Sequence, residues 1–184
     1  MMANRADKLD SFIKDIIDYS RNKRTEVSIE PVNFNLLLDE VMENFRFLEG
    51  AQKIRFEKKV HVNGSIKLDK SRVSVVLNNL ISNSIKYHNY YLEDPWIKVE
   101  VQSADGSVNI TIADNGQGIS RDHQLKIFDM FYRATDKSKG SGLGLYIVKE
   151  IVEKMDGIIT VASTVDMGTS FQITLPLVMN DKQL

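Results

Sequence analysis

Apolar residues recur at helical spacing in four segments of the chain. These segments, each of which predicts an amphipathic helix, are residues 7–20, 33–50, 70–90 and 143–157. The second segment has a plausible N-cap in Asn33 or Asn35 and a plausible end in Gly50. The polar residues 21–31 lack the helical period and are predicted to form a linker.

The first predicted helix carries an apolar stripe ahead of the globular pattern of the chain. Its members are Leu9, Phe12, Ile13, Ile16 and Ile17, with charged residues between them. A stripe of this kind fits either a lid on the core or one arm of a coiled-coil-like interface with a partner. We favour the partner interface.

Alternating apolar and polar residues predict three pairs of strands. Residues 53–68 alternate around Asn63-Gly64, which is typical of a hairpin turn. Residues 96–104 and 107–114 are joined at Asp105-Gly106, and residues 158–164 and 169–177 flank a turn at 166–168. This order of elements predicts an α+β fold in which one mixed, mainly antiparallel sheet carries helices on a single face.

Composition narrows the classes of function. The chain has 184 residues, and 24 Lys and Arg balance 25 Asp and Glu. Because no basic run is interleaved with aromatic residues, a nucleic acid partner is not expected. The absence of Cys excludes disulfides, thiolate metal sites and thiol nucleophiles. No apolar run is long enough to span a bilayer, so we expect no membrane contact.

The predicted helix over residues 70–90 has a polar face as informative as its apolar one. Its apolar side is formed by Val73, Val76, Leu77, Leu80, Ile81 and Ser84. On the opposite side, Asn79, Asn83, Lys86 and Tyr90 fall within a narrow stripe. The pattern therefore predicts two carboxamides and an ammonium group along one edge of a helix whose other side is core.

Five of the ten glycines lie within residues 114–145. Asp114 ends a predicted strand beside Gly116 and Gly118, where its carboxylate could pair with the exocyclic amine of a planar base. Asp-Asn-Gly is equally typical of a turn. Three further glycines, Gly140, Gly142 and Gly144, precede a helix whose N-terminus would attract an anion, although the spacing matches neither a P-loop nor a dinucleotide fingerprint.

Together, four motifs make a specific resemblance. "LNNLISNSIKYH", "DNGQGI", "IFDMFYR" and "GSGLGL" resemble, in order, the N box, first glycine box, F box and second glycine box of sensor histidine kinases. The resemblance covers roughly residues 30–177. It implies the Bergerat fold, a two-layer α/β sandwich that binds ATP with Mg²⁺.

The resemblance also implies a role for individual residues. Asn83 matches the ligand of the Mg²⁺ that bridges the ATP phosphates, with Asn79 beside it, and Asp114 matches the acceptor of the adenine amino group. The other matched positions fall into three groups. Near the nucleoside they are Tyr87, Gly116, Gly118, Ile119 and Thr169; near the phosphates they are Lys86, Arg133, Gly140, Ser141, Gly142, Leu143 and Gly144; at the base of a lid they are Phe128 and Phe131.

The N-terminal segment departs from the family pattern. "LDSFIKDIIDYSR" resembles the end of the second helix of the dimerisation and phosphoacceptor hairpin, whereas the helix that carries the acceptor histidine has no counterpart. We therefore expect residues 1–24 to be a remnant of that hairpin and residues 25–184 to be the ATP-binding domain. Because His61, His88 and His123 all lack the acceptor context, we assign no catalytic acid, base or nucleophile within the chain.

The resemblance implies partners and a location as well. The implied partners are the phosphoacceptor hairpin of a parent kinase, a second copy of that kinase in a homodimer, and the receiver domain of a response regulator. The implied location is cytoplasmic, with the membrane status of the parent left open. Two alternatives stay open: another Bergerat-fold enzyme, such as a chaperone or mismatch-repair ATPase or an anti-sigma-type serine kinase, and a non-catalytic module acting through residues 7–20.

Overall fold

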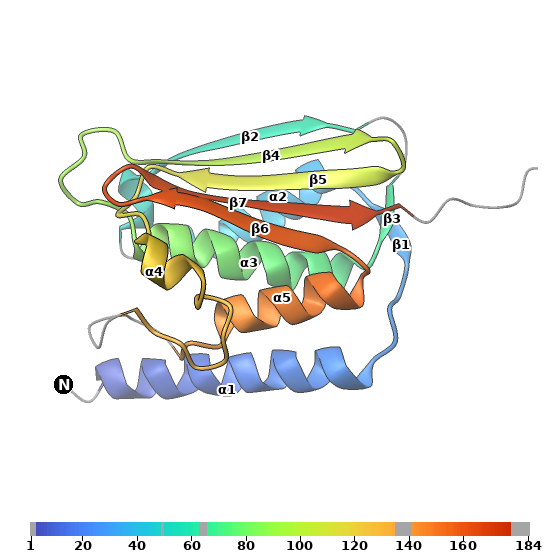
Figure 1. Cartoon of the computed structure of the whole chain (residues 1–184), viewed down its shortest axis with the longest axis horizontal. Helices are drawn as coiled ribbons and strands as arrows, with labels where there is room; N and C mark the ends of the chain where they lie inside the picture. The colour runs from blue at the N-terminus through green and yellow to red at the C-terminus, as the bar shows by residue number, and fades with distance from the viewer. Residues whose placement is uncertain (1–2, 49, 63–65, 135–140, 178–184) are drawn as a thin grey trace, which may run out of the picture.

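The computed structural model describes residues 3–48, 50–62, 66–134 and 141–177. Figure 1 shows a sheet on one side, helices α2, α3 and α5 beneath it, and α1 beneath α5. The helices are α1 (Ala3–Arg24), α2 (Phe34–Glu43), α3 (Lys70–Lys86), α4 (Arg121–Gln124) and α5 (Gly144–Lys154), with a 3₁₀ turn at Ala51–Lys53. The strands are β1 (Glu30–Val32), β2 (Arg55–His61), β3 (Ile66–Leu68), β4 (Trp96–Ala104), β5 (Ser107–Asp114), β6 (Ile158–Thr164) and β7 (Gly168–Pro176).

The main sheet has the strand order β2-β4-β5-β7-β6 among the described residues. Its β2–β4 pair is parallel and its other pairs are antiparallel. The turn between β4 and β5 has positive φ at Asp105 and Gly106, as an Asp-Gly hairpin turn requires. The predicted α+β class, with a mixed and mainly antiparallel sheet and helices on one face, is confirmed.

The core lies between the sheet and the helices because the strands alternate. Val108, Ile110 and Ile112 of β5 are fully buried, while the residues between them face outward. Opposite them lies the predicted apolar face of α3, from Val73 to Ser84, together with the buried residues of α5. Asn33 caps α2 by accepting from the amide of Leu36 at 3.2 Å, which selects the first of its two predicted starts.

The predicted hairpin over residues 53–68 is wrong. Strand β2 pairs in parallel with β4, and β3 pairs antiparallel with β1 in a separate two-stranded sheet. Strand β1 lies in the segment predicted to be a linker. Alternation shows that a segment is a strand but not which strand it pairs with. Two parallel neighbours must be joined by a crossover connection, and α3 makes this connection between β2 and β4. The turn residues Asn63 and Gly64 lie outside the described residues.

The helices differ from the predicted ones mainly at their ends. Helix α2 ends at Glu43 and is followed by turns, and α3 ends at Lys86 with Tyr87 as its C-cap, so Tyr90 lies in the following loop. Helix α5 ends at Lys154. Within the part of the chain that the structure describes, no helix combines the length and apolar character of a membrane span.

Helix α1 is longer than predicted and packs against α5. The rings of Tyr19 and Tyr146 lie 5.8 Å apart, and Phe12 is partly buried against the core. Ile13, Ile16 and Ile17 remain 46%, 44% and 56% exposed. One side of the helix thus covers the domain, while the other keeps the apolar residues that a partner interface would use, and that interface stays a prediction.

Candidate functional site

A cavity of about 510 Å³ opens between α3, the loop that follows β5, and the segment that leads into α5. Figure 1 shows α4 and the beginning of α5 above the first half of α1. Of the predicted site residues, those that line the cavity are Asn79, Asn83, Lys86, Tyr87, Asp114, Gly118, Ile119, Arg133, Ser141, Gly142, Gly144 and Thr169. Segments far apart in the sequence therefore converge on one hollow.

The polar face of α3 forms one wall. Asn79, Asn83 and Lys86 line the cavity, and Tyr90 does so from the loop beyond the helix. The carboxamide nitrogen of Asn79 donates to the carbonyl of Val75 at 2.9 Å, which fixes the orientation of that amide. Burial lowers the pKa of the Lys86 ammonium, and the charge of a nearby carboxylate opposes this shift. The wall thus offers amide oxygens and one partly desolvated cation.

Asp114 reaches the cavity from the end of β5. Its Oδ1 accepts from the amides of Gly116 at 2.9 Å and Thr169 at 3.3 Å, and its Oδ2 accepts from the hydroxyl of Ser84 at 2.8 Å. Burial raises the pKa of Asp114, and these three hydrogen bonds oppose the rise. A carboxylate can accept about four hydrogen bonds, so this one has capacity for a further donor from a ligand.

The glycines permit close backbone contacts around the cavity. Gly118 has φ +69°, and a Cβ there would lie 2.0 Å from the carbonyl oxygen of Thr164. Gly142 has φ +77°, and a Cβ there would lie 2.7 Å from the carbonyl carbon of Phe131. Any larger residue would separate these segments, so both positions require glycine.

The N-terminus of α5 forms the end of the cavity opposite Asp114. Gly144 begins the helix, and the hydroxyl of Ser141 accepts from the amide of Leu143 at 3.0 Å. The unpaired amides at a helix N-terminus and the helix dipole attract anions. Together with the Lys86 ammonium, they make this end of the cavity suited to phosphate groups.

The chemistry of the two ends is that of a nucleotide site, and comparison with known proteins supports this interpretation. A sequence model of the family of histidine kinase-, DNA gyrase B- and HSP90-like ATPases matches residues 68–179. The chain belongs to this ATPase family. The matched segment begins at the end of β3 and contains every element that lines the cavity except α1.

Relatives of the chain among curated proteins include sensor proteins. The chain is 34% identical over 173 residues to the sensor protein RprX of Bacteroides fragilis, which covers 89% of the chain and 32% of RprX. It is 31% identical over 178 residues to the aerobic respiration control sensor protein ArcB of Escherichia coli, covering 91% of the chain and 22% of ArcB. The chain therefore spans less than a third of the length of either relative.

Solved structures of histidine kinases share the fold of this chain. Full-length ShkA in complex with AMPPNP matches with a TM-score of 0.79 at 26% identity, covering 96% of the chain and 37% of ShkA. The catalytic domain of ThkA in a nucleotide-free form matches with a TM-score of 0.69 at 26% identity, covering 81% of the chain and 97% of that domain. The resemblance seen in four short motifs thus extends over the whole ATPase fold.

Some of the predicted site residues lie beside the cavity rather than in its lining. The backbone amide of Gly116 donates a hydrogen bond to the carboxylate of Asp114. Leu143 is buried, and its backbone amide donates to the hydroxyl of Ser141. Phe131 is 54% exposed with φ +63°, and its carbonyl faces Gly142. Phe128 packs edge-to-face on Phe171 with ring centroids 6.3 Å apart. Gly140 lies outside the described residues.

Several residues that line the cavity are not among those predicted from the sequence. Ser84 lies on the predicted apolar face of α3 and is buried. Its hydroxyl nevertheless donates a hydrogen bond to the carboxylate of Asp114. A buried hydroxyl one residue after Asn83 was the signal that could have found it. Asp15 comes from α1, outside the matched segment, and no local pattern points to it. The other missed residues include Gln117, Ser120, His123, Ile127, Tyr132 and Phe171.

Proposed function

We propose that the chain is the ATP-binding catalytic domain of a two-component sensor histidine kinase. Residues 25–184 form this domain, and residues 1–24 correspond to the end of the second helix of a dimerisation and phosphoacceptor hairpin. The observation that carries the proposal is the cavity itself, which has the half-buried carboxylate of Asp114 at one end and a helix N-terminus suited to anions at the other. The family membership and the sensor-kinase relatives support it.

In this proposal, Asp114 accepts a hydrogen bond from the adenine amino group, and Gly118, Ile119 and Thr169 surround the base. The hydroxyl of Thr169 lies 2.9 Å from that of Ser163, which itself donates to the carbonyl of Gly168, so this side of the base pocket is fixed by hydrogen bonds. The triphosphate extends toward Lys86 and the N-terminus of α5. A positive helix end and a desolvated ammonium neutralise charge that develops during phosphoryl transfer.

The residues of the cavity fit a magnesium ion bound together with ATP. Carboxamide oxygens are hard ligands, and Mg²⁺ in ATP sites takes few protein ligands because the phosphates and waters supply the rest. Among the described residues, no group of three or more His, Cys, Asp or Glu side chains could hold a metal alone. Asn83, with Asn79 beside it, would hold the ion, which would supply neutralising charge at the phosphates.

We predict that Asn83→Ala weakens the Mg²⁺-dependent part of ATP binding while adenosine binding stays the same. Lost hydrogen bonds or ligation to charged groups are worth about 1.5–3 kcal/mol, which corresponds to roughly 10- to 150-fold in affinity. Calorimetric titration with ATP, with and without Mg²⁺, measures the effect. Asn78→Ala is the matched control, because Asn78 lies on the same helix but bonds Asn44 and Ser74. Equal Mg²⁺-dependent affinity in both variants would show that Asn83 is not the ligand.

In this proposal, none of the three histidines of the chain is the acceptor of the phosphoryl group. The Nδ1 of His88 donates to the carbonyl of Ile85 at 2.6 Å in a buried position. The Nδ1 of His123 lies 2.6 Å from the hydroxyl of Tyr132, and His61 ends β2 at the edge of the sheet. The acceptor imidazole is therefore assigned to the hairpin of the parent kinase, which would pass the phosphoryl group to the receiver domain of a response regulator.

The experiment that tests the function traces radiolabel from the γ-phosphate of ATP in the presence of Mg²⁺. The chain alone should acquire no phosphohistidine, and a separately expressed acceptor hairpin of the parent kinase should become labelled in trans. The reaction should be much slower than in a linked protein, because a short flexible tether supplies an effective concentration in the mM range. An acceptor hairpin whose histidine is replaced by Ala is the control. Stable label on His61, His88 or His123 of this chain would overturn the assignment.

A further inference from the structure

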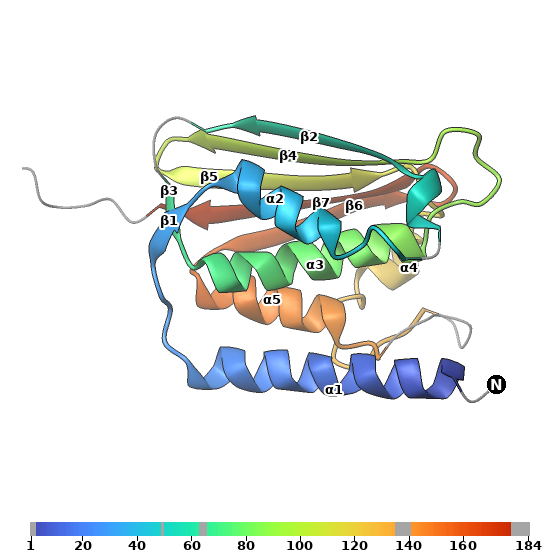
Figure 2. The same cartoon turned by 180° about the vertical axis from the view of Figure 1, so that it is seen from behind.

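Asp114, Thr169 and Ser163 form one row across three neighbouring strands. Thr169 of β7 pairs with Asp114 of β5 on one side and with Ser163 of β6 on the other. Figures 1 and 2 show these three strands side by side in the sheet from opposite directions. Residues directly opposite each other on neighbouring strands point to the same face of the sheet. The row begins in the cavity, which Asp114 and Thr169 both line, and it continues beyond the lining to Ser163.

The hydroxyl of Ser163 makes three hydrogen bonds. It accepts from the backbone amide of Ile119 at 2.8 Å and donates to the carbonyl of Gly168 at 2.8 Å. Its third partner is the hydroxyl of Thr169, at a distance of 2.9 Å between the two oxygens. A hydroxyl has one proton to donate and two lone pairs that accept, so these three bonds use its whole capacity.

The first two of these bonds determine the direction of the third. A carbonyl oxygen can only accept, so the single proton of Ser163 is used in the bond to Gly168. In the bond between the two hydroxyls, Thr169 must therefore donate its own proton to Ser163. The oxygen of Thr169 keeps its lone pairs for the cavity but has no proton left to donate there. Thr169 thus faces a ligand as an acceptor.

Gln124 of α4 braces this arrangement. Its side-chain nitrogen donates to the backbone carbonyl of Ile119 at 2.7 Å and to that of Ser163 at 2.9 Å. The two residues joined by the bond from the Ile119 amide to the Ser163 hydroxyl are therefore also held together through their carbonyls. This second connection keeps the Ser163 hydroxyl in place beside Thr169.

Backbone amides around this end of the cavity are used within the protein as well. The amides of Gly116 and Thr169 donate to the carboxylate of Asp114, and that of Ile119 donates to Ser163. Two acceptors, the Asp114 carboxylate and the Thr169 oxygen, therefore lie next to each other with capacity for a ligand. An exocyclic amino group has two N–H donors, which can reach these acceptors directly or through a water molecule.

We infer that Ser163 is a positioning residue for base selection, which holds Thr169 as an acceptor so that the site selects a base with an amino group over one with a carbonyl. The inference rests on the proposed function, because it takes the Asp114 end of the cavity as the base end. Ser163 acts through Thr169 rather than on the base itself. Without the Ser163 hydroxyl, the Thr169 proton is released, and Thr169 can donate to a carbonyl on the base.

The first test compares the affinities for Mg-ATP and for Mg-ITP, whose base has a carbonyl where adenine has its amino group. Wild type should prefer Mg-ATP, and Ser163→Ala should lower this preference about tenfold, because the released Thr169 hydroxyl exchanges an acceptor for a donor. Ser163→Thr keeps a hydroxyl on a residue that suits a strand, so it should restore the preference. Ser107→Ala is the matched control, because its hydroxyl also donates to a backbone carbonyl but lies at the opposite end of β5 from Asp114.

The ratio of the two affinities separates positioning from a merely structural role. If Ser163 only supported the fold, Ser163→Ala would weaken binding of both nucleotides by the same factor. A preference for Mg-ATP that stays unchanged in Ser163→Ala would overturn the inference.

A second variant, Thr169→Val, removes the acceptor itself and leaves the bonds of Ser163 to Ile119 and Gly168 in place. It should also lower the preference for Mg-ATP, and it tests the inference even where Ser163→Ala does not fold. In the Thr169→Val background, Ser163→Ala should change the preference no further, because its effect passes through Thr169. A full additional loss of preference in the double variant would contradict this route.

The same titrations distinguish a failure of this inference from a failure of the proposed function. Wild type that prefers Mg-ATP, together with Ser163→Ala and Thr169→Val variants that keep the full preference, would refute the role of Ser163 and leave the nucleotide site in place. Wild type that binds neither Mg-ATP nor Mg-ITP would refute the proposed function and this inference with it.

Discussion

Asp114→Asn is expected to weaken binding of adenine nucleotides about a hundredfold without lowering the free energy of unfolding, since a hydrogen bond to a charged group is worth about 1.5–3 kcal/mol and a donor-donor contact adds to the loss. The side-chain oxygen of Asn can still accept from the amides of Gly116 and Thr169, and its nitrogen can donate to the hydroxyl of Ser84. The same nitrogen would then meet the adenine amino group as a second donor.

The sign of the stability change follows from the pKa of Asp114. Burial raises this pKa in the folded protein, so the folded state holds the proton more tightly than the unfolded state does. The contribution of Asp114 to stability is therefore greatest at low pH and is lost as the pH rises through the raised pKa. Asparagine carries no such penalty at neutral pH, so the variant should unfold at the same or a higher urea concentration.

Calorimetry and urea unfolding of the same samples check both halves of this prediction. Asp105→Asn in the β4–β5 turn is the matched control, because Asn also tolerates the positive φ found there. Wild-type binding of ATP should weaken as the pH falls through the pKa of Asp114, and Asp114→Asn should lack that dependence. A variant that loses stability in proportion to its loss of binding would assign Asp114 a structural role instead.

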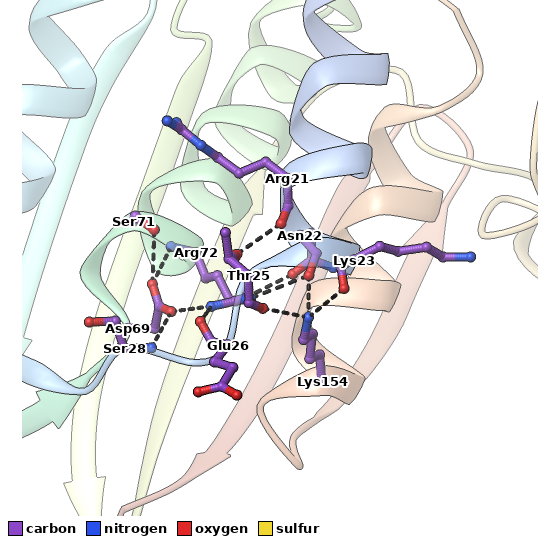
Figure 3. A network of polar contacts seen from close by, with 10 residues as sticks. All are labelled: Arg21, Asn22, Lys23, Thr25, Glu26, Ser28, Asp69, Ser71, Arg72 and Lys154. Carbon is purple, nitrogen blue, oxygen red and sulfur yellow. Dashed lines mark hydrogen bonds and ion pairs between the residues drawn. The ribbon is translucent and has the colours of Figure 1, made fainter.

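Arg72→Ala is expected to lower the free energy of unfolding by about 3–5 kcal/mol, the usual effect of removing one partner of a buried ion pair. Its partner Asp69 is 2% exposed. Burial would raise the pKa of Asp69, but hydrogen bonds from Ser28 and from Arg72 outweigh it and lower the pKa. Without the guanidinium, that buried charge loses its counterion, and the carbonyls at the end of α1 lose their donor (Figure 3).

Arg46→Ala provides the comparison for Arg72→Ala. Arg46 pairs with Glu43 on the surface, where both side chains are 66% exposed, so its loss should change stability far less. Urea unfolding followed by circular dichroism measures both variants. If the two substitutions had equally small effects, the buried pair of Arg72 and Asp69 would not be a main contributor to the stability of the domain.

The parts of the site that follow from local periodicity could be predicted from the sequence. Asn79, Asn83 and Lys86 share a face because they are spaced by four and three residues on one helix, and all three line the cavity. Asp114 was predicted at a strand end, and β5 ends there. For such residues, the helical or strand period alone determines where the side chain points.

The parts that depend on contacts between distant segments could not be predicted. The pairing of β1 with β3 joins two strands of three residues each, and so short a strand does not show in the sequence which other strand it pairs with. Asp15 meets Ser141 only because α1 docks on α5, and this docking depends on the buried polar contacts of Arg72. A charged residue on a predicted helix gives no indication of which distant carbonyls it will bond.

The most direct test of the account is a calorimetric titration of the wild-type protein with Mg-ATP and with Mg-GTP. Asp114 as an acceptor favours the amino group of adenine over the carbonyl that guanine presents at the same position, because a carboxylate and a carbonyl are both acceptors. We expect saturable binding of one Mg-ATP per chain and an affinity for Mg-GTP at least about tenfold weaker, as for a partly buried acceptor left without its donor. No saturable binding of Mg-ATP, or equal affinity for the two nucleotides, would contradict it.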